Sequence, residues 1–297
     1  MKICFLTQTA HDISDYYKEF FNKYDLFFIT FKTANPLAVD FVPKSTWSAG
    51  RNVLWEYVRG KYDYYVFIDD DLIFKVFNKK VSAFPFLAYL YYKVYKTSFV
   101  ESYELANPLY FFNRLKHYLL KYKPEVMAVT QLDGNPVNSL DTAIMRKNSF
   151  VRRVGFFDAQ FTVFSDYAAN KILPYDTKIS GWSSAQIAVY LYSFEVFASK
   201  AINVAELGVA NSHHVGAYTD TYNGMLDCAT MITEISKATQ KDYDSLSSGE
   251  DGSAVDYLFG KDVIINNIPD ASKKEDYKQN FKRITGIENL INANMKI

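Results

Sequence analysis

The stretch "YDYYVFIDDDLIF", residues 62–74, joins an apolar segment to three consecutive acids. Six of its first seven residues are aromatic or branched aliphatic, which is typical of a buried strand. Asp69, Asp70 and Asp71 follow directly, and like charges at one strand end repel one another unless a partner neutralises them. A divalent cation would do so, because hard carboxylate oxygens suit Mg²⁺ or Mn²⁺. The alternative is an acidic, solvated turn without a ligand.

Strand-like and helix-like segments alternate along the first quarter of the chain. Residues 2–8 ("KICFLTQ") and 25–33 ("DLFFITFKT") predict strands, and residues 12–24 have helical spacing. Residues 45–62 predict a second helix, preceded by a loop that contains Gly50. This order predicts an α/β fold with a mostly parallel, Rossmann-like central sheet flanked by helices. Ligands of such sheets bind beyond the carboxyl ends of the strands, which is where the three acids fall.

The chain divides into two expected parts. Residues 1–221 form the predicted α/β domain, interrupted by an aromatic insertion at 78–121 that we expect to hold two or three helices. Further strands are expected at 124–133 and 139–147 and after residue 201, and a buried helix at 184–197. From residue 222 the character changes, and residues 222–297 predict a helical C-terminal appendage that ends in an amphipathic segment.

Composition excludes several classes of function. Lys+Arg and Asp+Glu both number 33, so no global positive field exists to hold a nucleic acid. The two cysteines form no disulfide framework, and the apolar run at the start is too short for a signal peptide, so we expect a cytoplasmic protein. The interleaved lysines of residues 87–96 leave a peripheral membrane contact open. The 24 Tyr and 24 Phe suit either a core or a sugar-binding cleft.

A strand that ends in Asp-x-Asp, preceded by a helix that carries "AGRN" (49–52), resembles the nucleotide-sugar glycosyltransferases of the GT-A fold. The resemblance implies a metal-dependent hexosyl- or pentosyltransferase that moves a sugar from a UDP-sugar to a glycan or other hydroxyl acceptor. It implies that Asp69 faces the ribose, that Asp69 and Asp71 hold Mn²⁺ or Mg²⁺, and that Asp70 lies between them. Arg51 and Asn52 would contact the donor, with Arg51 on the diphosphate or the nucleobase.

A looser similarity covers more of the chain. The segments "YDYYVFIDDDL", "AVTQLDG", "SGW" and "VANSHHVGAY" follow the order of landmarks in a plant and bacterial family regarded as glycosyltransferases. This similarity assigns His214 as a third metal ligand, with His213 beside it. The family ends its third landmark on an acid, whereas this chain has Ala185 at that position and Gln186 after it.

The acid that this family would supply as catalytic base is absent at Ala185, so other carboxylates become the candidates for an inverting reaction. An inverting transferase needs a carboxylate to accept the proton of the acceptor hydroxyl. We expect Asp166 in this role, with Asp158 and Asp176 as further candidates. A retaining mechanism needs no such base, and Gln186 would then lie beside the anomeric carbon. Thr7, which we expect just after the first strand, would contact the nucleobase and ribose of the donor at the rim of the binding site.

Two other functions remain open. A phosphatase-like hydrolase with an aspartate nucleophile also ends a strand on Asp-x-Asp, although Leu72 and Ile73 follow here in place of its usual Gly-Thr. A non-catalytic module that binds a glycan or a membrane surface would use the aromatic insertion. Convergence of Asp69, Asp71 and His214 around one ion would favour the enzyme.

Overall fold

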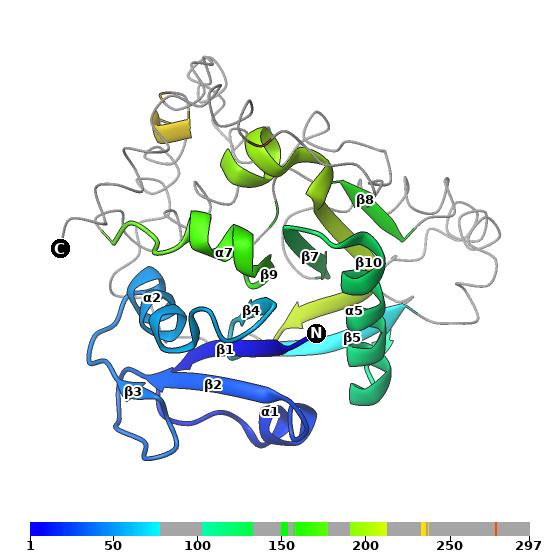
Figure 1. Ribbon diagram of the computed structural model, residues 1–297. Coiled ribbons are helices and arrows are strands. Elements are labelled where there is room, and N and C mark those ends of the chain that lie inside the picture. The colour runs from blue at the N-terminus through cyan, green and yellow to red at the C-terminus, as the bar shows by residue number, and fades with distance from the viewer. Residues whose placement is uncertain are drawn as a thin grey trace, which may run out of the picture.

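The computed structural model describes residues 1–77, 103–132, 150–153, 157, 159–177, 191–212, 233–235, 237 and 277. These residues form an α/β fold, a central sheet with helices on both faces, as the sequence predicts (Figure 1). The strands are β1 (Ile3–Thr9), β2 (Asp25–Thr30), β3 (Asp40–Phe41), β4 (Tyr64–Ile68), β5 (Leu72–Phe77), β6 (Tyr103–Leu105), β7 (Val126–Gln131), β8 (Val151–Arg153), β9 (Phe161–Ser165) and β10 (Ala201–Asn211). The helices are α1 (Asp15–Phe20), α2 (Trp47–Val58), α5 (Pro108–Tyr122) and α7 (Asp166–Ile172), with a π-helix η2 (Leu191–Phe197) and a 3₁₀ turn η3 (Ala198–Lys200).

The sheet is parallel in its first half and mixed beyond it. Its strand order is β3-β2-β1-β4-β9-β7-β10-β5-β6, and β8 pairs with β10. Strands β3, β2, β1 and β4 run parallel, as their β-α-β connections require. Strand β9 enters antiparallel between β4 and β7, and β5 and β6 are also antiparallel to their neighbours. The carboxyl ends of β1, β2 and β4 therefore lie along one edge of the sheet.

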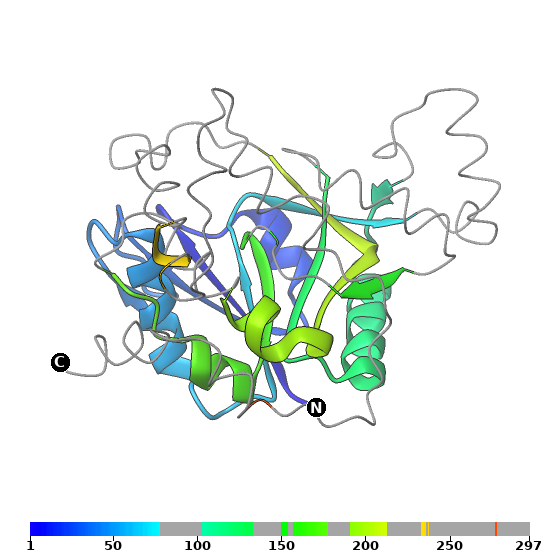
Figure 2. The same cartoon turned by 90° about the horizontal axis from the view of Figure 1, so that it is seen from above.

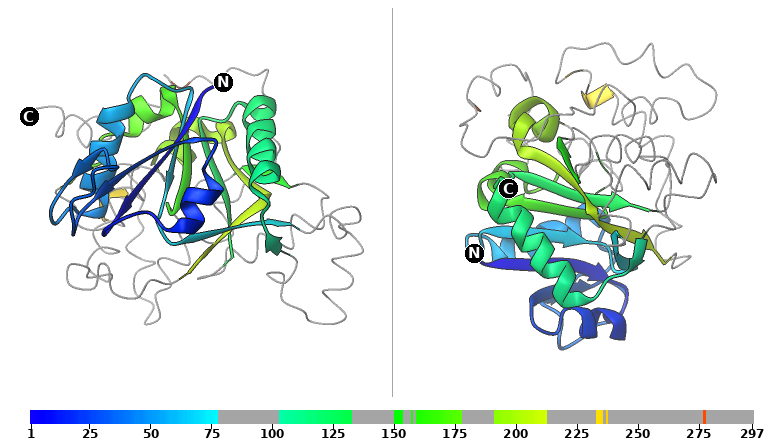
Figure 3. Two further views of the ribbon diagram at one scale, coloured as in Figure 1. Left: turned by 90° about the horizontal axis from the view of Figure 1, so that it is seen from below. Right: turned by 90° about the vertical axis from the view of Figure 1, so that its right-hand side faces the viewer.

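Each face of the sheet has its own hydrophobic cluster. On one face α2, α7 and η2 pack over the strands, and Trp55, Leu54 and Phe164 are completely buried there. On the other face α1 and α5 pack over an aromatic cluster that includes Phe5, Phe74 and Phe111. Figure 2 views the sheet from the side of α7, with α1 behind the strands, and Figure 3 shows α1 and α5 from the opposite side. The sheet thus has an apolar cover on both sides, and its polar groups gather at strand ends.

Helix α2 begins where the sequence predicts, but Gly50 lies inside it and not in a preceding loop. Thr46 caps the helix by accepting a hydrogen bond from Ala49 N at 3.2 Å. A Cβ atom on Gly50 would lie 1.8 Å from Gln8 Oε1. The glycine is therefore required for the close approach of α2 to β1, since any side chain would displace Gln8.

Several expectations fall on other parts of the chain. Of the insertion at 78–121, the described portion is β6 and most of α5, so it contributes a strand and a helix to the body of the fold. The helix expected at 184–197 is confirmed as η2 over its described end. The strand at 139–147 lies outside the described residues, as does nearly all of 222–297, so the division into two parts stays a prediction. No helix among the described residues is both long and apolar enough to cross a bilayer.

Candidate functional site

The acidic triplet forms a tight turn between β4 and β5. Strand β4 ends at Ile68, and β5 starts at Leu72, so Asp69, Asp70 and Asp71 make up the whole connection. All three residues are half-buried. The turn lies at the carboxyl end of β4 and next to the carboxyl end of β1, because these strands are parallel neighbours. This is the edge at which open α/β sheets bind ligands.

Two side chains of α2 donate hydrogen bonds to the Asp69 carboxylate. Arg51 Nη2 donates to Asp69 Oδ1 at 2.6 Å, and Trp47 Nε1 donates to the same oxygen at 3.2 Å. The Arg51 guanidinium also donates to Ala159 O at 3.1 Å and stacks 3.5 Å from the centre of the Trp47 ring. Arg51 is only 1% exposed. The expected direct contact of Arg51 with a diphosphate differs from this geometry, because the buried guanidinium neutralises and orients Asp69 instead.

The peptide groups of the turn form hydrogen bonds with three other segments of the chain. Asp69 N donates to Gln160 O at 3.0 Å, and Ser212 N donates to Asp71 O at 2.7 Å. The Tyr17 hydroxyl donates to Asp69 O and accepts from Leu72 N at 3.1 Å. Burial raises the pKa of Tyr17 well above its ordinary value, and the charges of the three aspartates raise it further. Tyr17 therefore stays protonated beside the acids.

Asn52 has a backbone partner and not a ligand-facing position. Its amide accepts from Tyr175 N at 2.7 Å and donates to Tyr175 O at 2.8 Å, which ties α2 to the segment after α7. The Tyr175 ring lies 5.9 Å from the Trp47 ring, centre to centre. Asp176, one of the candidate bases, directly follows Tyr175 and is half-buried. Tyr175 thereby lies beside Trp47, which donates to the Asp69 carboxylate, and Asp176 is its neighbour in the sequence.

Asp166, the base that we expected first, does not lie near the acidic turn. It is the first residue of α7, and it accepts hydrogen bonds from Tyr65 Oη at 3.0 Å and Asn170 Nδ2 at 3.2 Å. Its neighbour Ser165 pairs with Tyr64, the first residue of β4. The length of β4, about 13 Å at 3.3 Å per residue, separates the two ends. The structure thus places Asp166 away from the acidic turn, because β9 runs antiparallel to β4, and the sequence does not show that direction.

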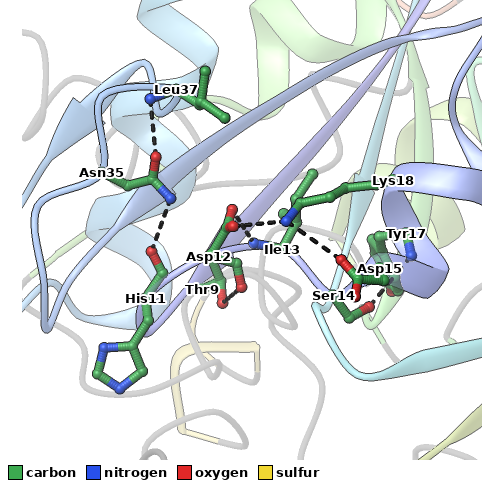
Figure 4. Close-up of polar contacts among 10 residues, drawn as sticks. All are labelled: Thr9, His11, Asp12, Ile13, Ser14, Asp15, Tyr17, Lys18, Asn35 and Leu37. Atoms are coloured by element: carbon green, nitrogen blue, oxygen red, sulfur yellow. Dashed lines mark hydrogen bonds and ion pairs between the residues drawn. The ribbon is translucent and has the colours of Figure 1, made fainter.

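Thr7 is the third last residue of β1 and is not at the rim. It is 1% exposed, and its hydroxyl has no hydrogen-bond partner among the described residues. The rim is formed by the loops that follow β1 and β2 (Figure 4). His11 Nδ1 lies 2.8 Å from Thr33 Oγ1, and Asn35 Nδ2 donates to His11 O at 3.3 Å. His11 and Thr33 are exposed at this edge and Asn35 is half-buried, whereas Thr7 is buried in β1.

A small polar cavity adjoins the turn on the β9 side. Its volume is about 10 Å³, which is room for a single water molecule. Three amide side chains line it among apolar groups, namely Gln131, Gln160 and Asn203. The main-chain carbonyl of Gln160 also accepts a hydrogen bond from Asp69 N, so Gln160 contacts both the cavity and the acidic turn.

The carboxylates of the turn are suitable ligands for a divalent metal, but the described residues supply only part of a complete ligand set. Asp70 and Asp71 offer half-exposed hard oxygen donors, whereas Asp69 Oδ1 is engaged by Arg51. Across the parts of the chain that the structure describes, no group of three His, Cys, Asp or Glu side chains could hold an ion. Three further candidates, His214, Gln186 and Asp158, lie outside the described residues, as does His213.

Sequence reasoning missed Trp47, Tyr17 and Tyr175. Tyr17 carried a signal as one of the apolar positions on one side of its helix, but nothing in its spacing indicates what its hydroxyl binds. Trp47 lies four residues before Arg51, which is one helical turn, so stacking between the two could have been expected. Tyr175 gives no local signal.

Comparison with known proteins yields weak structural likeness and no sequence match. No family model matches the chain, and no curated protein matches it. The structure of A197 from STIV is 10% identical, with a TM-score of 0.39, over 70% of this chain and 84% of that one. The mannosyltransferase PcManGT from Pyrobaculum calidifontis, solved with GDP-Man and Mn²⁺, is 8% identical, with a TM-score of 0.43, over 98% of this chain and 74% of that one. Likenesses of this size carry no argument about function.

Proposed function

We propose that the chain is a glycosyltransferase that takes a sugar from a nucleoside diphosphate sugar, with UDP-sugars as the first donors to test, and passes it to a hydroxyl of a glycan or glycoconjugate. The observation that carries the proposal is the acidic turn at the carboxyl end of β4, where a buried arginine holds Asp69 next to two further half-buried aspartates. An acidic turn that were merely solvated would not require a buried guanidinium and two aromatic side chains beneath it.

The donor site that we propose spans the ends of β1, β2 and β4. Asp71 and Asp70 would hold Mn²⁺ or Mg²⁺, and Asp69 would face the ribose from its fixed position on Arg51. The placement of Ser212 supports His214 as a further ligand, because Ser212 N bonds to Asp71 O. His214 follows Ser212 by two residues in the sequence, and its role as a ligand is part of this proposal.

The chemistry follows from charge and position. When bound, the metal would neutralise negative charge that develops on the departing nucleoside diphosphate. The remaining roles, positioning of the donor and proton transfer, belong to side chains of this protein. Arg51 and Trp47 keep Asp69 in one rotamer, so that no reorganisation is needed when the donor binds. For an inverting reaction we assign the base to Asp176 over Asp166, because Asp176 follows Tyr175, whose ring lies 5.9 Å from that of Trp47, whereas Asp166 lies at the opposite end of β4. For a retaining reaction Gln186 is the candidate that remains.

The test is a thermal-shift panel of UDP- and GDP-sugars, each with and without Mn²⁺. We expect the native protein to be stabilised by a nucleotide with Mn²⁺ and not by that nucleotide with EDTA. Asp71→Asn keeps the shape of the turn and should lose this stabilisation. Asp15→Asn removes an exposed carboxylate at the start of α1 and should keep it, which makes it the matched control.

Other outcomes would decide for the alternatives. Absence of stabilisation by any nucleotide in the native protein would refute the transferase. Release of phosphate from p-nitrophenyl phosphate, lost in Asp69→Asn, would point to the hydrolase. Binding of glycan arrays or anionic vesicles without any nucleotide effect would point to the binding module.

A further inference from the structure

Tyr17 has an unusual position for a polar side chain. It lies in the first turn of α1 and is 1% exposed, within the aromatic cluster between α1 and the sheet. Its ring centre lies 5.5 Å from that of Phe21 and 5.8 Å from that of Phe74. A hydroxyl in such surroundings is costly unless it finds hydrogen-bond partners. Its partners are two peptide groups of the acidic turn.

The hydroxyl bridges the two ends of that turn. It donates to Asp69 O and accepts from Leu72 N, the carbonyl and amide that a four-residue β-turn would join directly. The phenol oxygen thus takes the place of the turn's own hydrogen bond. The peptide planes between these two groups carry Asp70 and Asp71, so the position of the hydroxyl determines where both carboxylates point.

Two further contacts of the turn's main chain are made by peptide groups. Asp69 N is bound by Gln160 O, and Asp71 O by Ser212 N. Removing these contacts would require changes in the main chain of β9 and β10. The Tyr17 contact comes from a side chain, and one atom carries it.

We propose that Tyr17 is a positioning residue of the donor site: its hydroxyl sets the backbone of the acidic turn and thereby directs the Asp70 and Asp71 carboxylates toward a shared divalent cation and diphosphate. The second half of this inference rests on the proposed transferase function. The first half concerns the turn alone.

Helix α1 supplies a matched control. Tyr16 Oη accepts from Phe74 N at 3.0 Å, two residues further along β5, so Tyr16 also uses its hydroxyl to bind an amide of that strand. Tyr16→Phe and Tyr17→Phe each remove one hydroxyl and keep the ring. Both variants should fold, and Tyr17→Phe should lose more stability, because its buried hydroxyl binds two peptide groups and the Tyr16 hydroxyl binds one. Only Tyr17→Phe removes a contact of the acidic turn.

Two measurements test the proposal. Hydrogen exchange followed by mass spectrometry should show faster exchange in peptides that span Asp70–Leu72 in Tyr17→Phe and not in Tyr16→Phe. Calorimetric titration with UDP and with GDP, each with Mn²⁺, should show affinity weakened about tenfold in Tyr17→Phe, which is the size of one lost hydrogen bond. Affinity in Tyr16→Phe should stay within about twofold of the native protein.

The outcomes separate the two proposals. Unchanged exchange at Asp70–Leu72 in Tyr17→Phe overturns the positioning role, whatever the protein binds. Faster exchange with native nucleotide affinity overturns it as well, while the transferase stands. If the native protein binds neither nucleotide with Mn²⁺, the transferase fails, and the role of Tyr17 in donor binding fails with it.

Discussion

Glu206→Gln should destabilise the fold by about 2–3 kcal/mol at neutral pH. Glu206 lies on β10 where the register with β7 shifts between Val204 and Gly208, and it is 7% exposed. Its carboxylate accepts from Arg114 Nε at 2.8 Å and Nη2 at 2.5 Å, from Tyr110 Oη at 2.5 Å and from Tyr118 Oη. This network joins α5 to the sheet far from the acidic turn.

The magnitude follows from what the amide retains. Glutamine keeps one acceptor oxygen, and its NH₂ group can turn toward the Tyr110 oxygen, so no donor faces another donor. The three hydrogen bonds to Oε2, two from Arg114 and one from Tyr118, change from charge-assisted to neutral. A charge-assisted bond is worth about 1 kcal/mol more than a neutral one, so these three bonds account for the loss. The burial of a carboxylate is no longer needed, which returns part of the loss. Arg114 is 31% exposed on its side chain, so water can solvate its guanidinium.

The effect depends on pH in a defined direction. Burial by itself raises the pKa of Glu206, but the hydrogen bonds from Arg114 and the two tyrosines outweigh it, so the pKa in the folded protein is below its ordinary value. Stability from this group is therefore complete above the unfolded pKa of about 4.3 and is lost as pH falls through the folded pKa. The difference between the native protein and Glu206→Gln should be largest at pH 6–8 and shrink below about pH 4.

Urea unfolding at several pH values is the assay, with Glu104→Gln on the exposed part of β6 as control. The control should change stability by less than about 0.5 kcal/mol. A loss in Glu206→Gln that is equally large at pH 3.5 and pH 7 would refute the electrostatic account. No loss at either pH would show that the network contributes no net stability.

Three further variants or measurements test the packing. Gly50→Ala should cost about 1–3 kcal/mol in urea unfolding because its Cβ would displace Gln8, and Gly60→Ala should cost about 1–2 kcal/mol through backbone strain alone, because φ is +71 there and nothing lies within 4 Å. Asn107→Ala removes the cap of α5 and should lower stability by about 1 kcal/mol, measured in the same way. The Cys4 thiol is buried, and burial and the charge of Asp25 raise its pKa, so it should resist alkylation until the protein unfolds. Labelling of Cys4 in the native protein, detected by peptide mapping, would contradict its burial.

Local patterns account for much of the fold near the candidate site. The alternation of strand and helix through residue 68, the start of α2 at Thr46 and the end of β4 on three acids follow from periodicity, capping residues and charge. These signals are local because backbone hydrogen bonds within a helix, and the repulsion of adjacent carboxylates, involve residues close in sequence. They suffice to place the acidic turn at the ligand-binding edge of the sheet.

Sequence patterns were sufficient to predict β1, α1, β2, α2 and β4, the parallel direction of those strands and the position of Asp69, Asp70 and Asp71, whereas β3 and β5 were not predicted. The tertiary structure alone decided which groups surround them. It buried Arg51 under Asp69, brought the Tyr17 hydroxyl to the turn from 52 residues away, and put Asp166 at the far end of β4. The physical reason is that spacing tells which face of an element is buried, whereas the partner on that face is selected by packing among elements that are distant along the chain.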